Sequence, residues 1–360
     1  MPIAHEANFE TRWVKPTHTA PNFNVHRKMN RMTPVVLEDV VLQGNNLEEL
    51  VLISRRWGRQ IWKKSFKGGV EAGALVFKDR VYVTANDGTA SALDLKTGDT
   101  VWSFSSSTEN LSSPVLDTRT GFLYFHNAQN IVFGLDAQNG RQMWVYAKPD
   151  NSLLTIRGAA SPLVFNGVVY VGFSEGSFVA LNAQSGQVIW EQNLNRNKRF
   201  KDIDARAVPY KDTVLISGYD DKVYALRAET GQIVWTYPAG SYSAVTLWGE
   251  DIFVSTTDSR ILRLKADSGE LVSEVKGLKG LATESVVMEP YLIFGESQGL
   301  LKAIDLKSGR LAASFEPGRG VFSKPAVDEK TKSIFFISGE ANLYHLSFLQ
   351  NVTEPFHYIP

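Results

Sequence analysis

The chain repeats one arrangement of apolar and polar positions along most of its length. Most copies have two runs in which apolar residues alternate with others, a turn between them, and a final phrase whose fullest form is Leu-Asp-x-x-x-Gly-x-x-x-Trp. Six copies occupy residues 81–102, 123–144, 169–190, 214–235, 252–273 and 292–313, and a shorter seventh occupies 50–62. The glycines of the final phrase, from Gly58 to Gly309, follow one another at intervals of 40, 42, 46, 45, 38 and 40 residues. This period predicts a β-propeller with one blade per copy.

The local pattern is that of strands and turns throughout. Clusters of Gly, Asn, Asp and Ser separate the alternating runs, and no stretch keeps a helical apolar period for long enough to compete. In the final phrase, the Asp side chain can accept from backbone N–H groups two or three residues on, and the Gly can adopt positive φ. The sequence therefore predicts an all-β chain. The tryptophan recurs at Trp62, Trp102, Trp144, Trp190 and Trp235, and we expect it to pack between adjacent blades.

The two ends of the chain supply the parts of one further blade. Residues 333–348 offer an apolar pair of strands with no Trp-bearing strand after it, whereas residues 9–15 contain Trp13 with no strands before it. Pairing of these segments would close the ring and leave few exposed sheet edges. We predict an eight-bladed propeller of four-stranded blades, closed by the N- and C-terminal strands, with seven blades as the alternative. The single domain then spans residues 9–348, with tails at 1–8 and 349–360.

Composition restricts the chemistry. The 360 residues contain 38 Lys and Arg, 38 Asp and Glu, and no cysteine. The balanced charge argues against nucleic acid as a partner, and the lack of cysteine excludes disulfides, thiol nucleophiles and Cys-rich zinc sites. The chain has no zinc-peptidase motif and no P-loop motif, and its six histidines are scattered, so we expect them at the surface.

We therefore expect no catalytic residue, no cofactor and no metal. Four acids recur in the final phrases, and they could be offered as calcium ligands. Their place inside the turn favours a role as acceptors of backbone hydrogen bonds. These acids are Asp94, Asp136, Asp267 and Asp305.

Two connections between blades are longer than the rest, and they flank the same blade. Residues 148–162 and 193–209 each join the last strand of one blade to the first strand of the next, so both should emerge on one face of the disc. The first contains Leu154 and Ile156 beside Arg157, and the second contains Asp202 and Asp204, which point to the same side of an extended segment. Apolar residues and a guanidinium near two carboxylates suit a protein-docking site. Alternatively, Arg157 pairs with one of the carboxylates and ties the connections together, and the two interpretations are compatible.

The repeated phrase resembles that of the pyrroloquinoline-quinone-type propellers, over the chain from about Phe9 to Phe348. That family includes both enzymes and non-enzymes, so the function has to be inferred from residues that lie outside the repeated phrase. A quinone-dependent dehydrogenase would require a calcium and quinone site, and many such enzymes also have an adjacent cysteine pair and long insertions between blades. The chain has neither of these last two features, and the dehydrogenase remains an alternative.

The two long connections resemble those of the BamB family, propeller lipoproteins of the outer-membrane β-barrel assembly machinery. The family's Leu-x-Leu-Arg-Gly pattern corresponds to residues 154–158 and its Asp-x-Asp pattern to residues 202–204. The resemblance implies a non-enzymatic periplasmic scaffold that binds the POTRA (polypeptide-transport-associated) domains of the barrel subunit BamA and assists folding and insertion of outer-membrane proteins. It implies that the partner-binding residues are Leu154, Ile156, Arg157, Asp202 and Asp204.

The resemblance also implies a location and further partners. Family members are anchored by a lipidated cysteine, whereas residues 1–11 contain neither a cysteine nor an apolar segment. We expect the signal and the lipidated residue to have been removed ahead of Met1, with a non-lipidated relative as the alternative, and we expect the protein at the periplasmic face of the outer membrane. Unfolded barrel precursors could be held by strand addition at an outer blade edge, although the sequence does not indicate which edge. An interaction propeller of another envelope complex is a third interpretation.

Overall fold

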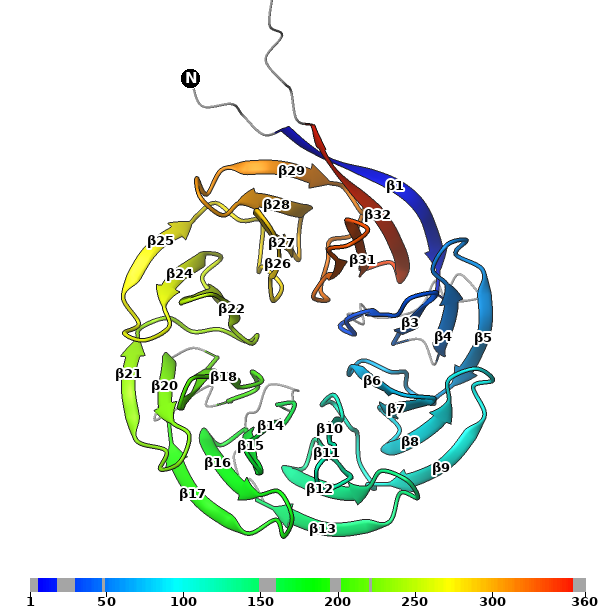
Figure 1. Cartoon of the computed structure of the whole chain (residues 1–360), viewed down its shortest axis with the longest axis vertical. Coiled ribbons are helices and arrows are strands. Elements are labelled where there is room, and N and C mark those ends of the chain that lie inside the picture. The colour runs from blue at the N-terminus through cyan, green and yellow to red at the C-terminus, as the bar shows by residue number, and fades with distance from the viewer. Residues whose placement is uncertain are drawn as a thin grey trace, which may run out of the picture.

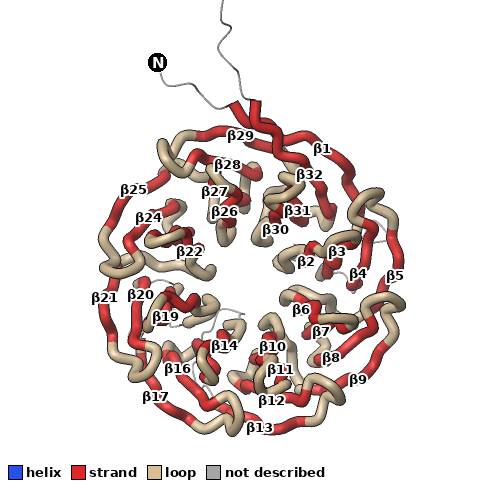
Figure 2. Tube along the Cα trace, in the orientation of Figure 1, coloured by secondary structure: helices blue, strands red, loops and turns tan. Residues whose placement is uncertain are grey.

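Eight four-stranded antiparallel sheets stand as blades around one axis (Figure 1). The computed structural model describes residues 6–17, 30–46, 49–148, 160–194, 202–219 and 222–351. Within these ranges the chain consists of strands and loops alone (Figure 2), and no helix is present that could cross a membrane. The first strand of each blade lies nearest the axis and the fourth lies at the rim (Figure 1). The predicted eight-bladed propeller is confirmed, and the seven-bladed alternative is wrong.

Seven blades take their four strands in chain order, and the eighth takes one strand from the other end of the chain. Blade 1 comprises β2 (Val35–Val36), β3 (Val40–Gly44), β4 (Glu49–Ser54) and β5 (Gln60–Ser65). Blade 2 comprises β6 (Ala74–Phe77), β7 (Arg80–Thr84), β8 (Thr89–Asp94) and β9 (Thr100–Ser105). Blade 3 comprises β10 (Val115–Asp117), β11 (Phe122–His126), β12 (Ile131–Asp136) and β13 (Gln142–Ala147). Blade 4 comprises β14 (Leu163–Phe165), β15 (Val168–Gly172), β16 (Ser177–Asn182) and β17 (Val188–Asn193).

The second half of the disc continues in the same way. Blade 5 comprises β18 (Val208–Tyr210), β19 (Thr213–Ser217), β20 (Val223–Arg227) and β21 (Ile233–Tyr237). Blade 6 comprises β22 (Thr246–Trp248), β23 (Asp251–Ser255), β24 (Ile261–Lys265) and β25 (Leu271–Val275). Blade 7 comprises β26 (Val286–Met288), β27 (Tyr291–Gly295), β28 (Leu301–Asp305) and β29 (Leu311–Phe315). Blade 8 comprises β30 (Ala326–Asp328), β31 (Ser333–Ile337), β32 (Asn342–Asn351) and, at the rim, β1 (Glu6–Pro16).

Blade 8 closes the ring by pairing the two ends of the chain. Its sheet order is β1-β32-β31-β30, and β1 runs antiparallel to β32 in a register with one irregularity, between Thr11 and Trp13. The rings of Phe9 and Phe348 lie 5.1 Å apart across this pair. The predicted closure by the terminal strands is confirmed, and these strands run beyond residues 9 and 348.

The rim tryptophan of one blade packs on the turn glycine of the next. In blade 3, the Trp144 indole lies so close to Gly186 of blade 4 that an added Cβ would stand 2.6 Å from the ring. Its Nε1–H donates to the Ala183 carbonyl of blade 4 at 2.9 Å. Five other tryptophans make the same donation to the next blade at 2.8–3.0 Å, namely Trp13, Trp62, Trp102, Trp190 and Trp235. The predicted packing between blades is confirmed, and it comes with a hydrogen bond.

The junction between blades 6 and 7 uses a different donor. Blade 6 has Ser273 where five earlier repeats have tryptophan, and Gly309 of blade 7 accordingly has open space where a Cβ would be. The guanidinium of Arg263 instead donates to the Leu306 carbonyl at 3.1 Å. This junction therefore keeps a hydrogen bond to the next blade and loses the aromatic packing on its turn.

Three of the four repeated acids accept backbone hydrogen bonds in the turns, as predicted, at 2.6–3.1 Å; these are Asp94, Asp136 and Asp305. The prediction is wrong for Asp267, whose carboxylate contacts Lys211 Nζ at 2.8 Å and the Tyr210 hydroxyl at 3.2 Å. The reason is that Lys265 ends the strand of this repeat, so that Asp267 lies further along the turn.

The prediction of surface histidines is also wrong for His126. Every residue of β11 is buried, and the His126 ring stacks edge-on against Phe173 of blade 4 at 5.0 Å between ring centroids. His126 occupies an alternate position in an apolar strand, which is the signal that identifies it as a core residue.

The glycine–tryptophan contact leads to a stability prediction. Gly186 and Gly309 both have positive φ, 71° and 68°, so an alanine at either should cost roughly 1–2 kcal/mol in backbone strain. At Gly186 the added methyl group would also overlap the Trp144 ring, which should cost about 1–3 kcal/mol more. We expect Gly186→Ala to lower the free energy of unfolding, measured by urea denaturation, by more than Gly309→Ala does. Equal losses would show that the indole does not constrain this turn.

Candidate protein-docking site

The two long connections bracket blade 4, as predicted. Residues 148–162 join β13 to β14 and residues 194–207 join β17 to β18, which gives 15 and 14 residues, compared with 8 to 10 at the five other connections between β5 and β30. Leu154, Ile156 and Arg157 lie outside the described residues, so their roles and the pairing of Arg157 stay predictions. Asp202 and Asp204 lie within them.

The backbone fixes residues 202–204 against blade 4. The Ile203 N–H donates to the Phe173 carbonyl at 3.2 Å, and the Ile203 side chain is fully buried. Its carbonyl oxygen would stand 2.2 Å from a Cβ on Gly172, so glycine at the end of β15 is what lets the segment approach. Residues 202–204 belong to no strand, and the predicted placement of Asp202 and Asp204 on one side stays a prediction.

The two carboxyl groups differ in exposure and influence each other. Asp202 is fully buried, and its carbonyl accepts the Tyr219 N–H of blade 5 at 3.2 Å. Asp204 is half-buried. Burial, and after it the negative charge of Asp202, raises the pKa of Asp204 to about 7, against the opposing effect of the Arg31 guanidinium. An ionised carboxylate held at a cost to folding is typical of a functional position.

A charged network on the same face lies close to the axis. Arg206, Glu284 and Lys324 each stand two residues before the innermost strand of their blade, in blades 5, 7 and 8. Glu284 accepts from Lys324 Nζ at 2.5 Å and lies 3.9 Å from the Arg206 guanidinium. Arg206 and Glu284 belong to blades separated by blade 6, so their contact places them beside the axis.

Sequence reasoning missed this network, although a signal for it exists. At the same position before the innermost strand, three other blades carry small hydroxyl side chains, namely Thr33, Ser113 and Ser161. The two remaining blades have Ala72 and Ala244 there, so a charged residue at a position that is otherwise small would have marked Arg206, Glu284 and Lys324. Together with Asp204 and Arg31, they give this face charge-bearing and hydrogen-bonding groups, the means by which protein surfaces select partners.

The described residues contain no group of three or more His, Cys, Asp or Glu side chains arranged to hold a metal ion. The candidate site consists of the fixed backbone at 202–204 and the charged network of Arg206, Glu284 and Lys324. It lies on the face of the disc where rim strands connect to innermost strands.

The raised pKa of Asp204 predicts how stability depends on pH. In the unfolded chain this carboxyl has its ordinary pKa of 3.8, whereas in the fold its pKa is about 7. The fold therefore bears no cost from Asp204 below pH 4, and bears the full cost of its charge above pH 7. Asp204→Asn should raise the free energy of unfolding by about 2–3 kcal/mol more at pH 8 than at pH 5. Urea denaturation at the two pH values checks this, and a pH-independent effect would contradict it.

Comparison with known proteins gives matches over most of the chain. A family model described as "Outer membrane protein assembly factor BamB" matches residues 46–274 and 212–352. The outer membrane protein assembly factor BamB of Shewanella oneidensis is 26% identical over 332 residues, covering 84% of this chain and 81% of the relative. That of Escherichia coli strain K12 is 25% identical over 301 residues, covering 79% and 76%.

The solved structures that share the fold of this chain include enzymes as well as an assembly factor. BamB from Moraxella catarrhalis superposes with a TM-score of 0.79 at 17% identity, covering 94% of this chain and 99% of that one. A quinohemoprotein alcohol dehydrogenase from Pseudomonas putida gives 0.78 at 13% identity, covering 94% and 76%. At such identities the likeness shows the fold alone. The family model, in contrast, matches the sequence from residue 46 to residue 352, and the chain belongs to the outer membrane protein assembly factor BamB family.

Proposed function

We propose that this chain is a non-enzymatic periplasmic scaffold of the outer-membrane β-barrel assembly machinery. It binds the POTRA domains of BamA through Leu154, Ile156, Arg157 and Asp204, with the buried Asp202 acting through its charge on Asp204, and so assists the folding and insertion of outer-membrane proteins. Its family is described as an assembly factor for outer-membrane proteins, and relatives in Shewanella oneidensis and Escherichia coli bear the same name. The two longest connections from rim to axis among blades 1 to 8 supply all five residues.

The observation that carries the proposal is the setting of Asp204. Its backbone is fixed by Ile203, so its carboxyl is presented in one position, which lowers the entropy cost of docking. Its raised pKa means that the fold, without a partner, disfavours the negative charge of the Asp204 carboxylate. An N–H or cationic donor from a partner would stabilise the ionised form, so that part of the cost is recovered only in the complex.

This mechanism predicts how partner binding depends on the carboxylate. Truncating a central interface residue typically costs about 2 kcal/mol or more, close to thirtyfold in affinity. We expect Asp204→Asn to weaken binding to purified POTRA domains by at least tenfold while raising the free energy of unfolding at pH 8. We expect Arg157→Glu to weaken binding as well. Wild-type affinity should rise between pH 6 and pH 8, because binding favours the deprotonated carboxyl.

Asp99→Asn is the matched control. Asp99 is exposed in the turn between β8 and β9 of blade 2, on the opposite face of the disc, and its substitution should leave binding unchanged. Wild-type protein that folds but does not bind POTRA domains would overturn the proposed partner and favour an interaction propeller of another envelope complex. Loss of binding by Asp99→Asn to the same degree would overturn the assignment of the site.

The dehydrogenase alternative is favoured only by fold, through the likeness to a quinohemoprotein alcohol dehydrogenase. Incubation with pyrroloquinoline quinone and calcium, followed by removal of free quinone, gives a direct test. We expect no quinone absorbance to remain with the protein. A stoichiometric bound chromophore would overturn the non-enzymatic proposal.

A further inference from the structure

Each blade ends at the rim in a strand whose outer edge pairs with no further strand in the described part of the chain (Figure 1). Such an edge exposes backbone N–H and C=O groups at strand spacing and can pair with another chain. Natural proteins guard edges with charged side chains or proline. Four rim strands follow this rule, with Lys63 and Lys64 on β5, Glu191 on β17, Glu274 on β25, and Glu10 and Arg12 on β1.

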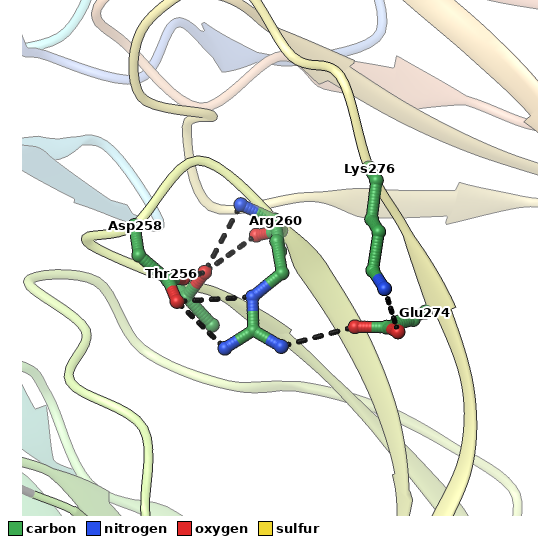
Figure 3. A network of polar contacts seen from close by, with 5 residues as sticks. All are labelled: Thr256, Asp258, Arg260, Glu274 and Lys276. Carbon is green, nitrogen blue, oxygen red and sulfur yellow. Dashed lines mark hydrogen bonds and ion pairs between the residues drawn. The ribbon is translucent and has the colours of Figure 1, made fainter.

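Blade 6 shows how a guarded edge is built (Figure 3). Glu274 of β25 accepts from Arg260 at 3.0 Å and from Lys276 at 2.6 Å. Arg260 also contacts the Asp258 carboxylate at 2.6 Å. A strand added along β25 would have to remove several of these charges from water, which is unfavourable without new partners.

The rim strand of blade 3 differs from the guarded edges. β13 contains no charged residue. Trp144 and Tyr146 face blade 4, where they meet Gly186 and Phe173. The alternate positions face outward and are all apolar: Met143 is 39% exposed, Val145 is 48% exposed, and Ala147 is exposed.

Comparison of the blades singles out Val145. In the six other blades built in chain order, the residue that pairs at this position in the rim strand is polar or charged: Lys63, Ser103, Glu191, Thr236, Glu274 and Ser314. The fold thus accepts a polar side chain here in every one of these blades. β9, β21 and β29 also lack charge but keep this polar residue, so β13 alone among these strands has a wholly apolar outward row.

Charge limits the length of this edge. Arg141 immediately precedes β13, and Lys148 immediately follows it. Lys148 is held by the carboxylates of Glu175 and Glu191 in blade 4, whereas Arg141 is exposed and lies beside the Met143 sulfur at 3.7 Å. A segment that could pair with this edge would be extended, about six residues long and apolar at every second position. It would be uncharged except for an acidic group at the end that meets Arg141.

We propose that the outer edge of β13 binds an extended segment of an unfolded outer-membrane protein as a fifth strand of blade 3. Transmembrane β-strands are segments of about ten residues in which apolar and polar side chains alternate. Their apolar row lies beside Met143, Val145 and Ala147 when such a strand is added. Main-chain hydrogen bonds then supply affinity that does not depend on a particular sequence, which suits a protein that assists many clients.

Blade 8 demonstrates rim-strand addition within this molecule. β1 comes from the far end of the chain and joins β32 by antiparallel backbone pairing from Glu6 opposite Asn351 to Pro16 opposite Asn342. The connection that follows β13 leads directly to the proposed POTRA-binding residues. A client on β13 would therefore be held next to the assembly partner. The proposal rests on the proposed function for the identity of the client, but uses a different surface.

The test uses the full chain and a fluorescent ten-residue peptide of alternating valine and threonine with a glutamate at its C-terminal end. Val145→Glu introduces the residue that blades 4 and 6 already carry, so the variant should fold with an unchanged melting temperature. We expect it to weaken peptide binding, measured by fluorescence anisotropy, at least tenfold. Ser103→Glu places the same charge at the equivalent position of β9 and should leave binding unchanged. A peptide whose backbone nitrogens are methylated along the edge that would pair with β13 should not bind.

Several outcomes would overturn the proposal. These are equal peptide binding by wild type and Val145→Glu, equal losses in Val145→Glu and Ser103→Glu, and unimpaired binding of the methylated peptide. A wild-type dimer in sedimentation that Val145→Glu dissociates would make this edge a self-association surface instead. POTRA binding should be unaffected by Val145→Glu. If the chain binds the peptide through Val145 but binds no POTRA domain, the proposal for the β13 edge is supported and only the proposed function is overturned.

Discussion

The disc depends on one repeated contact, the tryptophan indole that joins the rim of one blade to the turn of the next. Each indole fills the space above a turn glycine and donates to a backbone carbonyl in that turn, as Trp144 does with Gly186 and Ala183. The contact requires glycine for space, an aromatic ring for area, and a fixed register of the rim strand. It explains why glycine and tryptophan recur with the same spacing, because each residue in the pair serves a neighbouring blade. Arg263 shows that the hydrogen bond can be kept when the ring is lost.

The architecture was predictable because its causes are local and repeated. Alternation gives the strands, Asp94 and Asp136 satisfy turn N–H groups, and Trp13 fits the one blade that lacks a rim strand. Other features depend on residues that meet only in the folded disc. Arg206 and Glu284 come together from blades separated by a third, and neither has a distinctive neighbour in sequence. His126 and Asp267 were misassigned because residue type was weighed above position within the strand and turn.

The candidate site was predictable in part, for a related reason. The two connections were evident as departures from the repeat, and the two acids of residues 202–204 marked the second of them. The unequal burial of the two carboxyl groups was not predictable, because it depends on how Ile203 closes against Gly172 in the fold. The charge of Arg31, which lowers the pKa of Asp204, comes from a residue far away in the sequence. The face that carries Asp204 and the rim that carries Val145 are separate surfaces. Under the two proposals, a scaffold partner and an extended client would therefore bind different surfaces of the same disc.

The closure of blade 8 has a consequence for how the molecule is made. β1 is synthesised first, and its partner β32 is synthesised almost last. Bringing such distant segments together carries a loop-closure entropy cost on the order of 5 kcal/mol, which only a nearly complete disc can offset. The ring therefore stays open while the chain is being synthesised, and a chain that ends before β32 cannot close it. Because the ring closes through β1 and β32, the finished fold forms only after every strand from β1 to β32 has been synthesised.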